Sequence, residues 1–257
     1  MESIARFLRA HVAEAHAKGV VLGLSGGIDS ALTLRLSADA LGPSRVVGVL
    51  QPDAAYPAEL LEETLGIARS LSVETVVLPI DPVEGAFVAL VGAGLDPTGR
   101  GNLKARIRMT VLYAEARRRL SLVLGTGNKS ELLTGYFTKY GDGGVDLLPL
   151  GDLYKTEVRD LAAQLGLPAS IAARAPTAGL WPGQTDEGEL GITYELLDRI
   201  LRGMEELRSP ADIARLTGAD LAQIEEVAHR VALNRHKRRL PPIPKLSLRT
   251  VGVDWRD

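Results

Sequence analysis

The sequence predicts an α/β fold: a doubly wound, mostly parallel sheet with extra helices toward the C-terminus. Over the first 125 residues, short runs rich in Val and Leu alternate with helical patterns. These runs are continuously apolar, which is typical of strands buried on both faces of a parallel sheet. Strands joined in this order through helices imply right-handed crossovers. After Gly125 the strand pattern stops, so loops and helices are expected there.

The expected elements follow in a regular order. The N-terminal segment is an amphipathic pattern interrupted by Glu2, Arg6 and Glu14, which predicts a helix and not a signal peptide. The expected strands are residues 19–24, 45–50, 74–80 and 120–125, and the expected helices between them are residues 30–41, 57–71 and 102–120.

The C-terminal half combines long loops with helices. Residues 134–152 and 175–190 are polar and rich in Gly, which predicts loops. The expected helices are residues 155–165, 193–207, 210–216 and 219–231. Since no linker of low complexity divides the sequence, residues 1–257 are expected to form a single domain. Its sheet core would span about 19–125, and its loop-and-helix part about 126–257.

The composition excludes several classes of protein. With 257 residues, 46% of them hydrophobic, the chain can bury a large core. A net charge of −2 is unlike that of strong nucleic-acid binders, so no nucleic-acid partner is expected. The absence of Cys excludes disulfides, thiolate zinc sites and a cysteine nucleophile. No apolar run reaches about 18 residues, so we expect no membrane span and a cytoplasmic protein.

A glycine-rich turn follows the first expected strand. Residues 25–30 have the sequence SGGIDS. Two glycines let backbone N–H groups approach an anion, and the helix start adds unpaired N–H groups and a positive dipole. Ser25 and Ser30 can add hydroxyl donors. Asp29 would repel phosphate unless a cation lay between them, so we interpret Asp29 as a Mg²⁺ ligand. The alternative is a plain strand–turn–helix connection with a capping residue.

Two further segments carry candidate ligands. Arg106 can bind a phosphate or carboxylate through two N–H groups, or can belong to a solvated basic helix face. Thr126 and Glu131 follow the fourth expected strand, so they can face the same site as residues 25–30. Glu131 and Asp29 would then share one Mg²⁺ between them. The alternative for Glu131 is an acid that caps a helix start.

The remaining candidates lie in the C-terminal half. The Gly-rich and aromatic segment 135–146 suits either a lid over a ligand or a surface loop. Lys155 stands at a helix start, which is unfavourable for a cation unless it points at phosphate. Segment 175–190 is a second candidate lid, and the basic residues 236–238 bind either a ligand or only solvent.

Residues 25–30 resemble the PP-loop of ATP pyrophosphatases, whereas Walker A and GxGxxG patterns do not occur in the sequence. The ordered segments SGGIDS, NLKARIRM, GTGNKSE, GYFTKYGDGG, LYKTE, PTAGLWPGQTDEGELG and HKR resemble ammonia-dependent NAD synthetases over nearly the whole chain. This resemblance implies a Rossmann-like sheet. It also implies ATP- and Mg²⁺-dependent amidation of deamido-NAD by ammonia through an adenylated intermediate, which yields NAD, AMP and pyrophosphate.

The resemblance also implies a role for individual residues. ATP would be bound by Gly23, Leu24, Ser25, Gly26, Gly27, Ile28, Asp29, Ser30, Thr126, Lys155 and Thr177. Mg²⁺ would be held by Asp29 and Glu131, and deamido-NAD by Arg106, Lys139, Asp146, His236 and Lys237. Asp29 and Lys155 would be catalytic, and Asp142 is a candidate acceptor of a proton from ammonium. A homodimer with substrate sites across its interface is implied as well, and helix 102–120 is a candidate interface element.

Two alternatives to this function stay open at the level of sequence. One is a PP-loop enzyme that adenylates tRNA, although such enzymes usually carry a basic surface. The other is a nucleotide-binding regulator without turnover, against which the presence of Asp29, Glu131 and Lys155 argues. Larger relatives add a glutaminase domain with a cysteine nucleophile. This chain has no Cys, so free ammonia is the expected nitrogen donor unless a separate subunit supplies it. Residues 49–53 lack the Arg that many relatives carry there.

Overall fold

A parallel sheet lies at the centre of the computed structural model, which describes residues 1–91, 94–172, 174–177, 179–181, 183–251 and 254. Within these residues the sheet has four strands: β1 (Val20–Gly23), β2 (Val46–Leu50), β3 (Glu74–Val77) and β4 (Leu122–Leu124). Their order is β3-β2-β1-β4, and each neighbouring pair is parallel. The chain winds outward from β1 to β3 and then returns to the other side of β1. The predicted doubly wound sheet is confirmed, with its switch point between β1 and β4.

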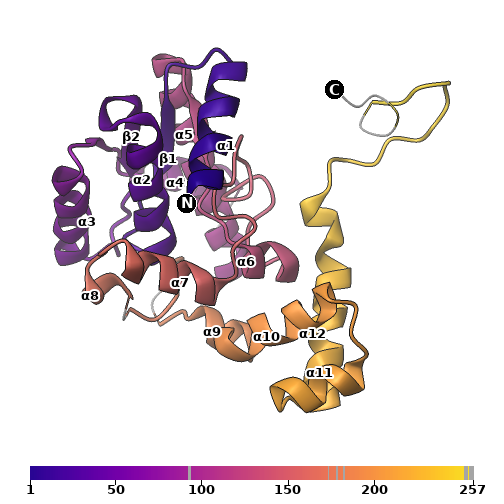
Figure 1. Cartoon of the computed structure of the whole chain (residues 1–257). Coiled ribbons are helices and arrows are strands. Elements are labelled where there is room, and N and C mark those ends of the chain that lie inside the picture. The colour runs from indigo at the N-terminus through magenta and orange to yellow at the C-terminus, as the bar shows by residue number, and fades with distance from the viewer. Residues whose placement is uncertain (92–93, 173, 178, 182, 252–253, 255–257) are drawn as a thin grey trace.

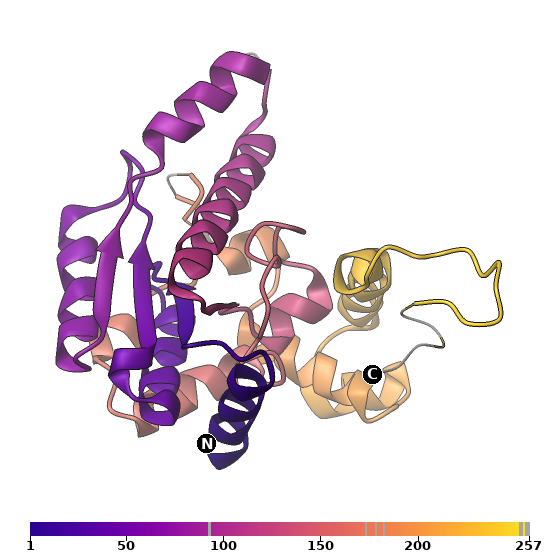
Figure 2. The same cartoon turned by 90° about the horizontal axis from the view of Figure 1, so that it is seen from above.

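Helices cover both faces of this sheet (Figures 1 and 2). Val20 and Leu22 of β1 belong to a core shared with α1 (Glu2–Glu14), α2 (Ile28–Leu41) and α7 (Lys155–Gln164). Val21 belongs to the core on the opposite face, which α5 (Pro97–Arg119) covers. The alternation follows from the pleat, which points successive side chains to opposite faces. Helix α3 (Ala58–Ser70) packs beside α2 and β3.

The expectation of burial on both faces is wrong for β3. Glu74 and Val77 are exposed there, whereas every residue of β2 is buried. β3 lies at one edge of the sheet, where α3 packs beside it. Glu74 meets solvent and forms an ion pair with Arg119 of α5 at 2.6 Å. The expected strand 74–80 also ends earlier, at Val77.

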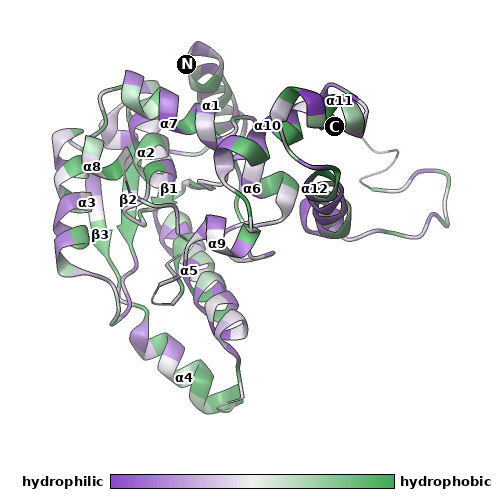
Figure 3. Ribbon diagram, turned by 90° about the horizontal axis from the view of Figure 1, so that it is seen from below, coloured by the Kyte–Doolittle hydropathy of each residue, from purple (hydrophilic) through white to green (hydrophobic). Residues whose placement is uncertain are grey.

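Several helices were not predicted. Helix α4 (Asp81–Val91) projects away from the sheet (Figure 3). Helix α5 begins five residues before the expected 102, because Asp96 caps it by accepting a hydrogen bond from the Gly99 amide at 2.6 Å. Short helices also lie in segments expected to be loops or left unassigned: α6 (Lys129–Thr134), α8 (Ala169–Ala172) and α9 (Asp186–Leu190).

The C-terminal helices have a hydrophobic core of their own. Helices α10 (Tyr194–Glu205), α11 (Pro210–Thr217) and α12 (Leu221–Leu233) confirm the expected ones with small shifts at their ends. They surround buried Tyr194, Leu197 and Ile200, and Tyr154 packs into the same core. The 3-10 helices are η1 (Pro43–Arg45) and η2 (Asn234–Arg238). After η2 the chain runs away from the body (Figure 1). Within the described part of the chain, none of the helices combines the length and apolar character needed to cross a membrane.

Candidate active site

The glycine-rich turn between β1 and α2 is closed by a serine and reaches the surface. Ser30 Oγ donates to the Gly27 carbonyl at 2.9 Å and accepts from the Ser25 amide at 3.3 Å. Gly26 has a φ of +78°, and a Cβ there would lie 2.5 Å from Leu60 of α3, so both conformation and space require glycine. Ser25 is exposed. The turn is therefore open to a ligand and is not sealed in the core.

Helix α2 begins at this turn with its first amides available. Gly27 is the N-cap, and no side chain of the described residues caps it. The amides of the first turn can therefore bind an anion, as the sequence predicts. Leu24 and Ile28 are buried in the core, so they can offer a ligand only their backbone. Gly23 is the last residue of β1.

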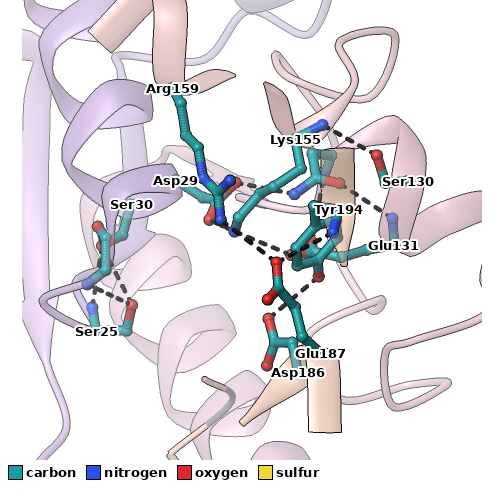
Figure 4. Close-up of polar contacts among 12 residues, drawn as sticks. Ser25, Asp29, Ser30, Ser130, Glu131, Lys155, Arg159, Asp186, Glu187 and Tyr194 are labelled. Carbon is teal, nitrogen blue, oxygen red and sulfur yellow. Dashed lines mark hydrogen bonds and ion pairs between the residues drawn. The ribbon is translucent and has the colours of Figure 1, made fainter. Parts of the chain in front are cut away.

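Lys155 joins the carboxylates that follow β1 and β4 (Figure 4). Its Nζ lies 2.5 Å from Asp29 Oδ2 and 3.5 Å from Glu131 Oε1, and its side chain is 3% exposed. Burial alone would lower the pKa of Lys155, but Asp29 and Glu131 outweigh it and raise that pKa. Lys155 is therefore a charged ammonium. Its two acidic partners explain how a cation is tolerated at the start of α7.

Glu131 has two roles in this structure. With Asn128 it forms a capping box, since Asn128 accepts from the Glu131 amide at 3.0 Å and the Asn128 amide donates to Glu131 at 3.1 Å. Asn128 Nδ2 also donates to Asp29 Oδ1 at 3.0 Å. Acting as a helix cap therefore does not exclude a metal role, because the same carboxyl group faces Lys155. Burial, aided by the charge of Asp29, raises the pKa of Glu131 to about 8.

A third acid and a tyrosine complete this group. Asp186 accepts a hydrogen bond from the buried Tyr194 hydroxyl at 3.1 Å, and burial raises the pKa of Asp186. The Tyr194 ring centroid lies 5.4 Å from Lys155 Nζ. Asp29, Glu131 and Asp186 thus surround the single positive charge of Lys155, and a bound cation would favour loss of the protons that Glu131 and Asp186 retain.

The oxygens of Asp29 and Glu131 are the donors that Mg²⁺ prefers. Across the described residues, no group of three or more His, Cys, Asp or Glu has the arrangement of a metal site. A two-carboxylate set fits Mg²⁺, which commonly takes its other ligands from water and substrate phosphate. The residues present therefore fit the ion.

Four of the five residues expected to bind deamido-NAD lie in contact with one another. Arg106 donates to the Lys139 carbonyl at 3.4 Å, and Lys139 donates to the His236 carbonyl at 2.9 Å. Lys237 donates to the carbonyls of Gly135 at 2.7 Å and Phe137 at 2.9 Å. Helix α5, the loop after α6 and η2 thus meet at one place.

The fifth residue, Asp146, is tied to the sheet. It accepts from the Tyr113 hydroxyl at 2.9 Å and from the Val123 amide at 2.7 Å. Tyr113 belongs to α5, as Arg106 does, so Asp146 is linked to the same helix.

Asp142 and Thr177 form hydrogen bonds within their own loops, and Thr126 is placed only by its position after β4. Asp142 accepts from the Thr138 amide at 2.8 Å, and loss of solvation raises its pKa. Thr177 is exposed and accepts from the Gly179 amide at 3.0 Å. Thr126 follows β4 and is half-buried. Ala178 and Pro182 of the motif 175–190 lie outside the described residues.

Sequence reasoning did not identify Asn128, Asp186, Tyr194 or Arg174. Asn128 could have been found, because it stands three residues before Glu131 in the spacing of a capping box. Asp186 lies within the motif PTAGLWPGQTDEGELG, which carries the family resemblance as a whole without singling out this acid. Arg174 donates to the Gly26 carbonyl of the glycine-rich turn (residues 25–30, hereafter the phosphate turn) at 2.5 Å, and only its place before residue 175 marks it in the sequence.

Residues 1–241 match the protein family described as NAD synthase. The chain belongs to the NAD synthase family. The NH3-dependent NAD+ synthetase of Methanosarcina mazei is 46% identical over 243 residues, which cover 93% of this chain and 95% of that protein. The structure of NMN synthetase from Francisella tularensis is similar with a TM-score of 0.85 and 34% identity, covering 95% and 96% of the two chains. The structure of the NH3-dependent NAD synthetase from Campylobacter jejuni is similar with a TM-score of 0.80 and 33% identity, and the match again covers 95% of this chain and 96% of that one.

Membership of the NAD synthase family makes this chain a ligase. The predicted resemblance and the predicted class of enzyme are confirmed, and so is the α/β fold that the family implies. An enzyme that adenylates tRNA is not favoured.

The stability of the ligand-free NAD synthase should depend on the titration of Glu131. A carboxyl group with a raised folded-state pKa holds its proton more tightly when folded than when unfolded. The free energy of unfolding therefore falls as the pH rises from about 4.5, the ordinary pKa of a glutamate side chain, to about 8, the pKa of Glu131 in the folded protein. Urea unfolding without metal or nucleotide at pH 5.5 and 8.5 should show a larger loss of free energy for the wild type than for Glu131→Gln. Burial also raises the pKa values of Asp186 and of Asp198, an acid of α10, but both groups titrate in the wild type and in the variant alike. An equal loss in the two proteins would therefore contradict this assignment.

Proposed function

We propose that this NAD synthase joins ammonia to the nicotinate carboxylate of deamido-NAD, with ATP as the activating substrate and Mg²⁺ as the cofactor. The observation that carries the proposal is the meeting of Asp29, Glu131 and Lys155 beside an open phosphate turn. The names of the M. mazei and C. jejuni relatives support the choice of ammonia and NAD.

In the first step, an oxygen of the nicotinate carboxylate attacks the α-phosphorus of ATP, and the bond to pyrophosphate breaks. The free amides at the start of α2 would receive the departing diphosphate, and the ammonium group of Lys155 would neutralise part of its charge. Catalysis here depends on positioning and charge, because phosphoryl chemistry of this kind needs little else from the protein. Mg²⁺ held by Asp29 and Glu131 would supply further neutralisation of phosphate oxygens.

In the second step, ammonia attacks the carbonyl carbon of the adenylate, and AMP leaves with the former carboxylate oxygen. Ammonium must first lose a proton. We propose Asp142 as the acceptor, because its raised pKa makes it a stronger base than an ordinary carboxylate. Segments 135–146 and 175–190 would keep water from hydrolysing the adenylate.

We assign deamido-NAD to the group formed by Arg106, Lys139, His236 and Lys237, with Asp146 beside it, and we assign ATP contacts to Thr126 and Thr177 as well. The basic side chains of this group suit the phosphates of a dinucleotide. Lys139 and Lys237 now donate to backbone carbonyls, so their charges are not paired with acids in these contacts.

We also propose that residues 1–257 act as a single domain and that the chain forms a homodimer through α4 and α5. Val83, Phe87, Leu90 and Val91 form an exposed apolar stripe on α4, and Leu90 is 81% exposed. Figure 3 shows this helix standing clear of the body. Exposed stripes of this kind mark contact surfaces. Arg106 lies on the exposed side of α5, so a partner chain here would border the deamido-NAD residues.

The function is tested by incubating the purified protein with ATP, Mg²⁺, ammonium and deamido-NAD. We expect NAD, AMP and pyrophosphate in equal amounts. ADP, or no amide, would contradict the proposal. A parallel assay with nicotinate mononucleotide is needed because one similar structure is that of an NMN synthetase. If the protein preferred the mononucleotide, the proposed amidation reaction would stand, but nicotinate mononucleotide would replace deamido-NAD as the substrate.

Glu131→Gln should lower turnover at saturating ATP by about a hundredfold or more, because it removes one of two carboxylates for Mg²⁺. Glu157→Gln is the matched control. Glu157 occupies the same capping-box position in α7 but forms its ion pair with Arg202. Steady-state rates of AMP release measure both variants. Wild-type turnover in Glu131→Gln would exclude a metal role for this residue.

Light scattering of the wild type should give a molar mass of two chains of 27.4 kDa. Leu90→Glu should shift the mass toward one chain, because it places a charge in the apolar stripe. Leu207→Glu changes an exposed leucine outside α4, 91% exposed, and should leave the dimer intact. A wild-type mass of one chain would refute the dimer without bearing on the reaction.

A further inference from the structure

Arg174 connects the phosphate turn to α3. Its Nη1 donates to the Gly26 carbonyl at 2.5 Å, and its Nη2 donates to Glu63 Oε2 at 2.5 Å. Glu63 Oε1 in turn accepts from the Ser170 hydroxyl at 2.5 Å. Arg174 and Glu63 each expose about a third of their side chain, at 32% and 28%. The guanidinium is therefore fixed in direction by an acid on one side and by the phosphate turn on the other.

The contact with Gly26 sets the direction of a neighbouring amide. In a trans peptide, the carbonyl of one residue and the N–H of the next point in opposite directions. Arg174 holds the Gly26 carbonyl on the side of α3, so the Gly27 amide points the other way. There it faces Ser25 Oγ at 3.3 Å, on the exposed side of the turn. An incoming phosphate would approach from this side.

Glycine on both sides of this peptide makes its orientation adjustable. A flipped peptide would turn the Gly26 carbonyl toward the phosphate and would need a positive φ at residue 27, which glycine allows. The observed φ at residue 27 is −87°, which any residue adopts. A carbonyl oxygen facing phosphate is repulsive, so the flip would weaken anion binding.

We propose that Arg174 is a positioning residue that holds the Gly26–Gly27 peptide with its amide toward the pyrophosphate of ATP. This rests on the proposed function only in taking pyrophosphate as the ligand of the turn. Two other roles are distinguishable from it. If the positive charge of Arg174 attracted phosphate directly, its loss would weaken binding equally whether residue 27 were glycine or alanine. If Arg174 only stabilised the fold, its loss would weaken the binding of all ligands alike.

The test is a double-mutant cycle in the full-length protein, with Mg²⁺-pyrophosphate binding measured by calorimetry. Arg174→Met removes the hydrogen bond, and Gly27→Ala disfavours the flipped peptide because alanine resists a positive φ. The added Cβ would lie 3.4 Å from Ser25 Oγ, an ordinary contact. We expect Arg174→Met to weaken binding on the order of tenfold when residue 27 is glycine. In the Gly27→Ala background we expect a loss of less than about threefold.

Equal losses in both backgrounds, or no loss in either, would overturn the proposal. Arg174→Lys can still donate to Gly26 and should restore most of the affinity. Ser170→Ala removes a partner of Glu63 without touching Arg174 or the turn, and serves as the control with affinity near that of the wild type. In the amidation assay, Arg174→Met should raise KM for ATP and leave KM for deamido-NAD unchanged. An equal rise in the KM values for ATP and for deamido-NAD would indicate a general structural role for Arg174 and would overturn the proposal.

A second readout does not need a bound ligand. In protein labelled with ¹⁵N-glycine, the resonance missing from Gly27→Ala identifies the Gly27 amide. Arg174→Met should shift this resonance, whereas that of Gly85 in α4 should stay in place. An unmoved Gly27 resonance would refute the role even if Gly27→Ala bound no pyrophosphate. Failure of the wild type to form an amide would instead count against the proposed function, because pyrophosphate binding is measured independently of turnover.

Discussion

The buried ammonium of Lys155 and its two carboxylate partners are the interaction on which the rest of the site depends. Asp29 follows β1, Glu131 follows β4, and Lys155 begins α7, so three separate segments meet at one nitrogen atom. An unpaired buried charge is costly, whereas here the ammonium group of Lys155 has acidic partners in Asp29 and Glu131. The geometry exists only because the sheet places β1 beside β4. The parallel pairing of β1 with β4 thus brings Asp29 and Glu131 together in the ligand-free chain.

A second polar contact ties the C-terminal helices to this centre. Asp198 of α10 accepts from the Ser130 hydroxyl at 2.5 Å and from the Thr156 amide at 2.9 Å. Ser130 in turn accepts from the Lys155 amide at 2.9 Å. The starts of α6 and α7 are therefore held by one buried acid from a helix far along the chain. Helices α10 to α12, which have a core of their own, are thereby connected to the segments that hold Glu131 and Lys155.

Local patterns in the sequence predicted the sheet, the phosphate turn and the meeting of the loops after β1 and β4. Each of these depends on neighbouring residues or on the general geometry of parallel sheets. Asp198 and Arg174 could not be predicted in this way, because their contacts join segments 42 residues or more apart. Helix α4 was missed for a different reason, since its apolar residues face outward and do not mark a core. At Glu131, a capping pattern coincides with the position proposed for a metal ligand.

Lys155 also explains how acids can be kept ready for a cation in the ligand-free chain. Two carboxylates with no partner would repel each other and move toward solvent, and the site would have to be rebuilt each time a ligand bound. The ammonium group holds them within 3.5 Å of one point. Burial, aided by the charge of Asp29, raises the pKa of Glu131 to about 8, so this carboxyl group keeps its proton at neutral pH in the ligand-free chain. The site is therefore preorganised before a ligand binds, and its second acid would become a carboxylate if a metal bound together with the nucleotide.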